Sequence, residues 1–300
     1  PRRHLVASRR GPRYDRWMKT IRLLTIGNSF SENAITYLPQ LAAVDGSVAF
    51  DIHRASLGGC TLEKHWNLAD YTRQDPGYKP YTLQPGTNPC NLQEALAAQP
   101  WDFVTLQQAS PRSWIRATFE PFLGNLLREI RTLAPGAEPL LHQTWAYRSD
   151  AGFLADKGIT QRYMFDRIRE NYDHFSAVHQ LRLLRAGAAV QAARETPGHA
   201  FAWPDPAYDY AHPRPPALPD QTHSLIAGWR WNINGTADGK PELVKDVIHL
   251  NSDGCFLIGC LWFERLTGRG ILDNPFKPDT MSDATAGFLR GIAHTIAQEP

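Results

Sequence analysis

The stretch of residues 21–31, IRLLTIGNSFS, constrains the fold of this chain more than any other. An apolar run typical of a buried parallel strand stops at Gly27, and the hydroxyl residue Ser29 follows two positions later. Ligands of open α/β sheets gather just beyond the carboxyl ends of such strands, so Ser29 is predicted to lie where chemistry is done. The alternative is that Ser29 or Ser31 only caps a helix that begins near Asn33.

Further strands and helices are predicted from apolar runs and from helical spacing of apolar residues. The strands are residues 48–54, 101–106, 139–145 and 181–185, and the helices are 34–44 (bent at Pro39), 61–71, 92–98, 118–132, 161–181 and 188–194. This alternation predicts one flavodoxin-like domain over residues 18–300, a three-layer α/β/α sandwich with a parallel sheet of about five strands.

The basic residues are distributed unevenly along the chain. The net charge is +2, but residues 1–17 alone hold six arginines and one aspartate, so the remainder is mildly acidic. A basic arm that contains a tryptophan could bind nucleic acid, but no basic stripe follows it. We therefore expect a disordered arm at residues 1–17 and no nucleic-acid function.

The cellular compartment depends on where the natural chain begins. No apolar run is long enough for a signal peptide or a membrane span. Met18 would make a natural start, which predicts a cytoplasmic protein; a secreted or periplasmic protein is expected if a leader has been removed. The sequence leaves both alternatives open, and it does not indicate the oligomeric state.

The four cysteines, Cys60, Cys90, Cys255 and Cys260, show neither a CxxC pair nor a zinc-binding spacing. We expect free buried thiols, because cysteine in an apolar segment behaves as a small hydrophobe. No metal site is indicated, and no cofactor is expected.

Four motifs follow one another along the chain: GNSFS at residues 27–31, SLGGCTLEKHW at 56–66, VTLQQAS at 104–110 and DVIHLNSDG at 246–254. Together they resemble the SGNH/GDSL hydrolases, in which a G-D-S or G-N-S turn after the first strand carries the nucleophile. The resemblance spans roughly residues 20–268 and is greatest to a branch with G-N-S-F-S and Q-Q-x-S motifs, some of whose relatives are carbohydrate esterases. It implies a serine nucleophile at Ser29.

The resemblance also implies an oxyanion hole. Its donors would be the backbone N–H groups of Ser29 and Gly59 and one side-chain amide after the 101–106 strand. The usual G-x-N-D motif is replaced here by Gln107 and Gln108, and strand alternation lets only one of these two side chains point into the site.

A catalytic base is sought among three D-x-x-H sequences, Asp209/His212, Asp220/His223 and Asp246/His249. The first two lie in a proline-rich stretch where no neighbouring element is expected to hold a carboxylate against an imidazole. His249 is expected on a short turn anchored by the apolar helix that follows it, and a base must be positioned before it is useful. We therefore assign His249 as the base and Asp246 as the residue that orients it.

Residues expected to bind substrate fall into two groups. His142, Gln143 and Trp145 end the 139–145 strand and could line a sugar site, or Trp145 could belong to the core. Residues 197–240, with Trp229 and Trp231 among their aromatic side chains, lack helix or strand periodicity and are interpreted as a lid or binding insertion over the serine. The alternative for this segment is a subunit interface.

The function predicted from these features is a serine esterase that hydrolyses a carboxylic ester through Ser29, His249 and Asp246, with an acetyl group on a carbohydrate as the expected substrate. A second hypothesis is a carbohydrate-binding protein that retains the fold without turnover. A third is a nucleotide-phosphate binder that uses the Gly27 turn, which the absence of a P-loop lysine disfavours.

Overall fold

The structure, a computed structural model, describes residues 18–233 and 239–300. Its centre is a sheet in which every neighbouring pair of strands is parallel. The five strands are β1 (Lys19–Gly27), β2 (Val48–Ser56), β5 (Phe103–Leu106), β6 (Glu138–His142) and β7 (Arg182–Leu184), in the spatial order β2-β1-β5-β6-β7. This is the flavodoxin-like order, with the first strand between the second and the third. The predicted fold class is confirmed.

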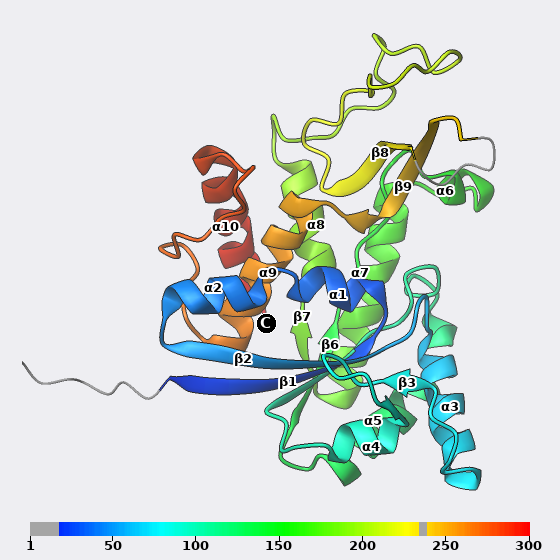
Figure 1. Cartoon of the computed structure of the whole chain (residues 1–300), viewed down its shortest axis with the longest axis vertical. Helices are drawn as coiled ribbons and strands as arrows, with labels where there is room; N and C mark the ends of the chain where they lie inside the picture. Colours follow the sequence, from blue (N-terminus) through cyan, green and yellow to red (C-terminus); the bar gives the residue numbers. More distant parts are fainter. Residues whose placement is uncertain (1–17, 234–238) are drawn as a thin grey trace, which may run out of the picture.

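Helices cover both faces of this sheet (Figure 1). One layer contains α3 (Leu62–Gln74), α4 (Leu92–Ala97) and α5 (Phe122–Leu133), and the opposite layer contains α1 (Ser29–Ile35), α2 (Leu38–Asp45), α9 (Ser252–Thr267) and α10 (Asp283–Ala297). The long helix α7 (Gln161–His179) connects β6 to β7, and α8 (Ala186–Glu195) then packs against α9. The shorter elements are β3 (Tyr81–Thr82), β4 (Pro89–Cys90), η1 (Arg116–Thr118) and α6 (Gly152–Asp156).

The most buried helix is α9, because its sequence is apolar on every side. It packs against α1, α2, α8 and α10, and its residues 254–264 are all buried. The Asn251 side chain caps its start by accepting from the N–H of Gly254 at 2.9 Å, and Gly268 ends it in the left-handed conformation. All four cysteines are free and buried, as predicted.

The predicted helix over residues 34–44 is two helices. α1 begins at Ser29 rather than near Asn33, and α2 begins at Leu38, so that Pro39 lies in a first turn, where its missing N–H costs no helical bond. Among the described residues, no helix is both long enough and apolar enough to cross a membrane.

The predicted absence of regular structure from residues 197–240 is wrong in its second half. Residues Ile226–Asn232 form β8, which pairs antiparallel with β9 (Glu242–Leu250). This β8–β9 hairpin stands above α1 in Figure 1, and the irregular chain before it extends further from the sheet. The predicted basic arm at residues 1–17, like residues 234–238 of the insertion, lies outside the described residues.

Buried ion pairs fasten the β8–β9 hairpin to the segment that follows β6. The Asp150 side chain is fully buried and accepts from Arg148 through both oxygens, at 2.7 and 2.9 Å. Lys245 of β9 lies 3.2 Å from the same carboxylate, and the N–H of Arg148 donates to the Val247 carbonyl at 3.0 Å. Because breaking a buried pair leaves an uncompensated charge, these contacts fix β9 against the body of the domain.

Aromatic residues of the insertion pack on one another beside the hairpin. Trp203 stacks near Trp229 with ring centroids 6.1 Å apart, and Tyr210 contacts both rings. The Lys245 ammonium lies 5.2 Å from the ring centroid of Trp203 and 4.8 Å from that of Trp229. These side chains therefore form a small cluster around a cation, which adds to the attachment of the insertion to β9.

Candidate active site

The nucleophile candidate lies at the point where the order of the sheet reverses. The ends of β1 and β5 are neighbours, with Ile26 opposite Leu106, and ligands of this fold class bind in the crevice at that point. Asn28 caps α1 by accepting from the N–H of Phe30 at 3.1 Å, so Ser29 is the first helical residue and not the cap.

Gly27 is required by the close packing of this turn. A Cβ atom there would lie 2.4 Å from the Ser31 hydroxyl oxygen and about 3 Å from the Gln107 side chain. The hydroxyl of Ser31 donates to Oε1 of Gln107 at 2.7 Å, so this hydroxyl is engaged in a buried hydrogen bond. Of the two serines in the motif, only Ser29 is free to reach outward.

Ser29, His249 and Asp246 form one hydrogen-bonded chain. The Oγ of Ser29 lies 2.8 Å from Nε2 of His249, and Nδ1 of His249 lies 2.8 Å from Oδ2 of Asp246. The second oxygen of Asp246 accepts from the N–H groups of Ile248 and His249, each at 3.0 Å. In the neutral imidazole, Nδ1–H donates to Asp246 and Nε2 accepts from the serine hydroxyl, which is the arrangement that a general base needs.

His249 lies near the end of β9 and not on a short turn as expected, although α9 does follow it. A hydrogen bond also joins the end of β9 to α1: the N–H of Leu250 donates to Oδ1 of Asn33 at 3.1 Å. The side chain of His249 is 40 % exposed, so the imidazole is fixed yet open to a substrate.

The pKa values of the pair are displaced in opposite directions. The hydrogen bond to Asp246 raises the pKa of His249 above its ordinary value of 6.5, against the effect of burial, and the charges of Asp246 and Glu32 raise it further. Burial alone would raise the pKa of Asp246, but hydrogen bonds from His249 and Ile248 hold it well below its ordinary value. The carboxylate is thus charged at neutral pH and stabilises an imidazolium.

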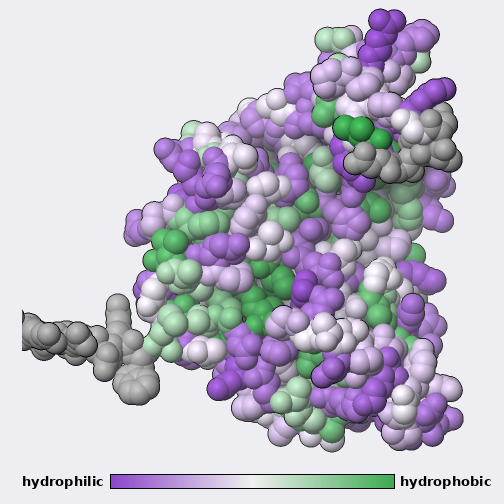
Figure 2. Space-filling view, in the orientation of Figure 1, coloured by the Kyte–Doolittle hydropathy of each residue, from purple (hydrophilic) through white to green (hydrophobic). Residues whose placement is uncertain are grey.

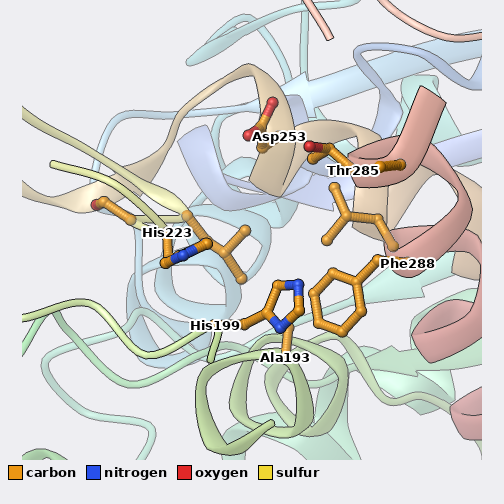
Figure 3. Close-up of a pocket in the computed structure, with 10 residues that line it drawn as sticks. Ala193, His199, His223, Asp253, Thr285 and Phe288 are labelled. Carbon is orange, nitrogen blue, oxygen red and sulfur yellow. The ribbon is translucent and has the colours of Figure 1, made fainter. Parts of the chain in front are cut away.

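The other two D-x-x-H sequences differ from this arrangement. Asp209 and His212 do pair, at 3.2 Å, which corrects the expectation that nothing would hold them together, but the His212 side chain is 77 % exposed. Asp220 instead accepts from Thr222. His223 lines a separate cavity of about 140 Å³, whose wall also includes His199 stacked on Phe288 (Figure 3).

Gln107 and Gln108 do not supply the expected oxyanion donor, and this prediction is wrong. Both side chains are fully buried. The Gln107 amide nitrogen donates to Oδ1 of Asn28 at 2.6 Å, and that of Gln108 donates to the Thr118 carbonyl at 2.7 Å. Their oxygens accept from Ser31 and from the N–H of Leu62, respectively. Both glutamines therefore satisfy buried polar groups around the site.

Two backbone donors remain for an oxyanion. The N–H groups of Ser29 and Gly59 have no protein partner within residues 18–233 and 239–300. Gly59 is exposed with φ +60°, a conformation that glycine adopts without strain. The loop that carries it is fastened to the nucleophile turn, because Asn28 donates to the Cys60 carbonyl at 3.1 Å and the N–H of Leu57 donates to the Gly27 carbonyl.

His142, Gln143 and Trp145 cannot line a sugar site, because all three are fully buried; this expectation is also wrong. Burial lowers the pKa of His142 to about 3, so its imidazole is neutral. The side-chain oxygen of Gln143 accepts from the N–H of Ala188 at 2.8 Å. Trp145 packs on Phe30, in accordance with the core alternative.

Trp229 and Trp231 lie on β8 and are partly buried. Trp229 belongs to the aromatic cluster around Lys245, and the indole N–H of Trp231 donates to the Ala217 carbonyl at 2.9 Å. This strand partner could not be predicted from the insertion alone, since the pairing with β9 depends on residues that follow it.

A groove of about 420 Å³ lies along α1, the helix whose first residue is Ser29. Its walls come from α1, α2 and β2 and from Pro85, and its lining is Glu32, Asn33, Ile35, Thr36, Pro39, Ile52, Arg54 and Pro85. Hydrophobic residues gather on the part of the surface where these elements lie (Figure 2). The groove thus offers apolar contacts beside a carboxylate, an amide, a hydroxyl and a guanidinium. The sequence motifs did not indicate it, because its residues are scattered.

A profile of the family described as a domain of unknown function (DUF4886) matches residues 22–201. The chain belongs to this family. The match includes Ser29, Gly59, Gln107 and Gln108, whereas Asp246 and His249 lie beyond it.

Several solved structures are similar to this DUF4886 chain. A DUF4886 family protein from Bacteroides uniformis is 26% identical over 92% of this chain and 94% of that chain, with a TM-score of 0.68. A candidate SGNH hydrolase from Slackia heliotrinireducens is 25% identical over 58% of this chain and 83% of its own, with a TM-score of 0.42. A lipase/acylhydrolase from Enterococcus faecalis is 16% identical over 83% and 96%, with a TM-score of 0.45. No curated protein matched the sequence.

Proposed function

We propose that this DUF4886 protein is a serine hydrolase that cleaves carboxylic esters. The observation that carries the proposal is the chain from Ser29 Oγ to His249 Nε2 and from His249 Nδ1 to Asp246, with both contacts at 2.8 Å. A serine hydroxyl is a weak nucleophile until a base removes its proton, and this geometry supplies that base.

The reaction then follows from the positions of these groups. Ser29 Oγ attacks the ester carbonyl while His249 Nε2 takes the hydroxyl proton, and Asp246 stabilises the imidazolium. The N–H groups of Ser29 and Gly59 receive the negative charge on the carbonyl oxygen. The imidazolium protonates the departing alcohol, and water, activated by the same imidazole, releases the acid from the acyl-serine.

The proposed substrate is an acyl group, with acetyl the first choice, carried on a saccharide. The groove beside α1 supports this choice, because it combines the apolar side chains of Ile35 and Ile52 with the polar groups of Glu32 and Arg54. Carbohydrate rings present the same combination of apolar faces and hydroxyl edges. The volume of about 420 Å³ lies within the range of small-molecule sites.

A serine-directed fluorophosphonate tests the reaction class, and a panel of p-nitrophenyl acetate and acetylated oligosaccharides tests the substrate. We expect stoichiometric labelling at Ser29 and release of acetate. A protein that binds the saccharides but is neither labelled nor active would instead be a carbohydrate-binding protein on this fold.

We predict that kcat/KM rises with pH through an apparent pKa above 6.5, because only neutral His249 accepts a proton and Asp246 holds the imidazolium. Activity is therefore lost as the pH falls through the raised pKa. A kcat/KM profile of p-nitrophenyl acetate hydrolysis measures this midpoint, and Asp246→Asn should lower both the midpoint and the plateau. A profile that is flat between about pH 5 and pH 8 would contradict the role of His249.

We predict that Trp229 and Trp231 serve selectivity. Changing both to Ala should leave p-nitrophenyl acetate hydrolysis within about threefold, while an acetylated oligosaccharide loses on the order of 1 to 3 kcal/mol of transition-state binding. Trp66→Ala is the matched control, because Trp66 is also a partly buried tryptophan but lies on α3 in the opposite layer. Equal losses on both esters would mean that β8 only supports β9 structurally.

A further inference from the structure

Trp145 contacts both halves of the proposed catalytic site. Its ring stacks on that of Phe30, the residue after Ser29, with centroids 4.0 Å apart and an interplanar angle of 14°. Its indole N–H donates to the carbonyl oxygen of Ile248, the residue before His249, at 2.8 Å. The side chain of Trp145 is fully buried, and its acceptor residue Ile248 is partly buried.

The Ile248 peptide group is held on both sides. This is the peptide that joins Ile248 to His249: its N–H, that of His249, donates to Oδ1 of Asp246 at 3.0 Å, and its carbonyl, that of Ile248, accepts from Trp145. This peptide lies within the three-residue link between the acid and the base, so its orientation sets the direction of the His249 side chain relative to Asp246. On the other side, the ring of Phe30 meets the His249 imidazole edge-on at 6.3 Å.

We propose that Trp145 is a positioning residue that sets the register between the α1 turn carrying Ser29 and the β9 segment carrying Asp246 and His249. The kinetic effects expected from this inference rest on the proposed function, whereas the positioning of the two segments by Trp145 does not depend on it. Two contacts of one rigid side chain act together. The stacking of Trp145 on Phe30 fixes α1, and the indole N–H fixes the peptide between Ile248 and His249.

The consequence of losing the indole N–H is specific. The partly buried Ile248 carbonyl would lose its indole donor, which favours rotation of the peptide toward another donor. The Asn33–Leu250 hydrogen bond would still hold the end of β9 near α1. We therefore expect a loss of alignment without detachment of the hairpin, and misalignment of a catalytic group lowers the rate steeply.

The chain offers a matched control for a tryptophan substitution. Trp262 on α9 is also fully buried, but its indole N–H has no protein partner in the described part of the chain. Trp145→Phe and Trp262→Phe thus remove the same atoms from the same core, and only the first removes a hydrogen bond next to the catalytic residues.

Trp145→Phe should lower kcat by roughly 10- to 100-fold with KM within about twofold, and should slow fluorophosphonate labelling equally. Trp262→Phe should leave kcat within about threefold even though it lowers the melting temperature. Equal kcat in the two variants would overturn the proposal. If Trp145→Phe does not fold, site-specific incorporation of benzothienylalanine at position 145 replaces only the N–H by sulfur and is expected to reproduce the loss of kcat.

An NMR titration of the His249 imidazole separates this proposal from the proposed function. The charged groups that influence this imidazole are Asp246 and, on α1, Glu32. Loss of the Trp145 contact should move the pKa of His249 down toward about 6.5, whereas Trp262→Phe should leave it raised. A wild-type protein that fluorophosphonate does not label would refute the hydrolase, while this titration would still support or refute the positioning role. An unchanged His249 pKa together with an unchanged labelling rate would refute that role.

Discussion

Replacement of Ser29 by Ala is expected to lower esterase turnover by at least ~10³-fold and to abolish fluorophosphonate labelling. The fold should be retained, because the only side-chain hydrogen bond of Ser29 among the described residues is the one to His249. Initial rates on p-nitrophenyl acetate, with circular dichroism and melting temperature as checks on the fold, measure this outcome.

Ser31→Ala is the control for this experiment, since Ser31 lies two residues later on the same helix and its hydroxyl donates to buried Gln107. It should cost about 1 kcal/mol of unfolding free energy through the lost hydrogen bond but leave turnover within a few-fold. Retention of more than a tenth of the activity by Ser29→Ala, or a larger loss in Ser31→Ala, would exclude Ser29 as the nucleophile.

Replacement of His249 by Ala should cost at least ~10³-fold in kcat, because no other base contacts the Ser29 hydroxyl in the described residues. His212→Ala is a closely matched comparison: His212 also pairs with an aspartate three residues earlier, but it lies exposed on the insertion. We expect this second variant to retain activity within about twofold, as is usual for exposed surface positions.

Kinetics of both variants on one ester decide between the two D-x-x-H sequences. The reversed order of effects would show that the base comes from the insertion and that the contact between Ser29 and His249 is not used in catalysis.

The sheet could be predicted from sequence because its strands are short apolar runs bounded by turn residues. The catalytic candidates followed from where these runs end: Ser29 comes after β1, and Asp246 and His249 come just before the apolar α9. These are local signals, and the fold brings their residues together at a known edge of the sheet.

The errors arose where the direction of a side chain decides its role. Gln107, Gln108 and His142 do lie at strand ends as predicted, but they point into the packed interior, and the partners that satisfy the two glutamines come from distant parts of the chain. The start of α1 was misplaced because Ser29 and Ser31 were considered as caps, whereas the side chain of Asn28 accepts from the N–H of Phe30. Strand β8 was missed because its one partner strand among the described residues, β9, follows the insertion, so that the segment around Trp229 and Trp231 carries no strand signal of its own.

The acid and the base lie three residues apart on one strand, whereas the nucleophile comes from a helix 220 residues earlier in the chain. A rigid displacement of the β8–β9 hairpin would therefore lengthen the contact between Ser29 and His249 and leave the contact between His249 and Asp246 intact. The pKa of His249 is thus set mainly by Asp246 on the same strand. The distance between His249 and Ser29 depends instead on the position of the hairpin relative to α1. Substitutions that displace the whole hairpin should therefore alter the rate more than the pH range of the reaction, unlike loss of the Trp145 contact, which acts within the link between Asp246 and His249.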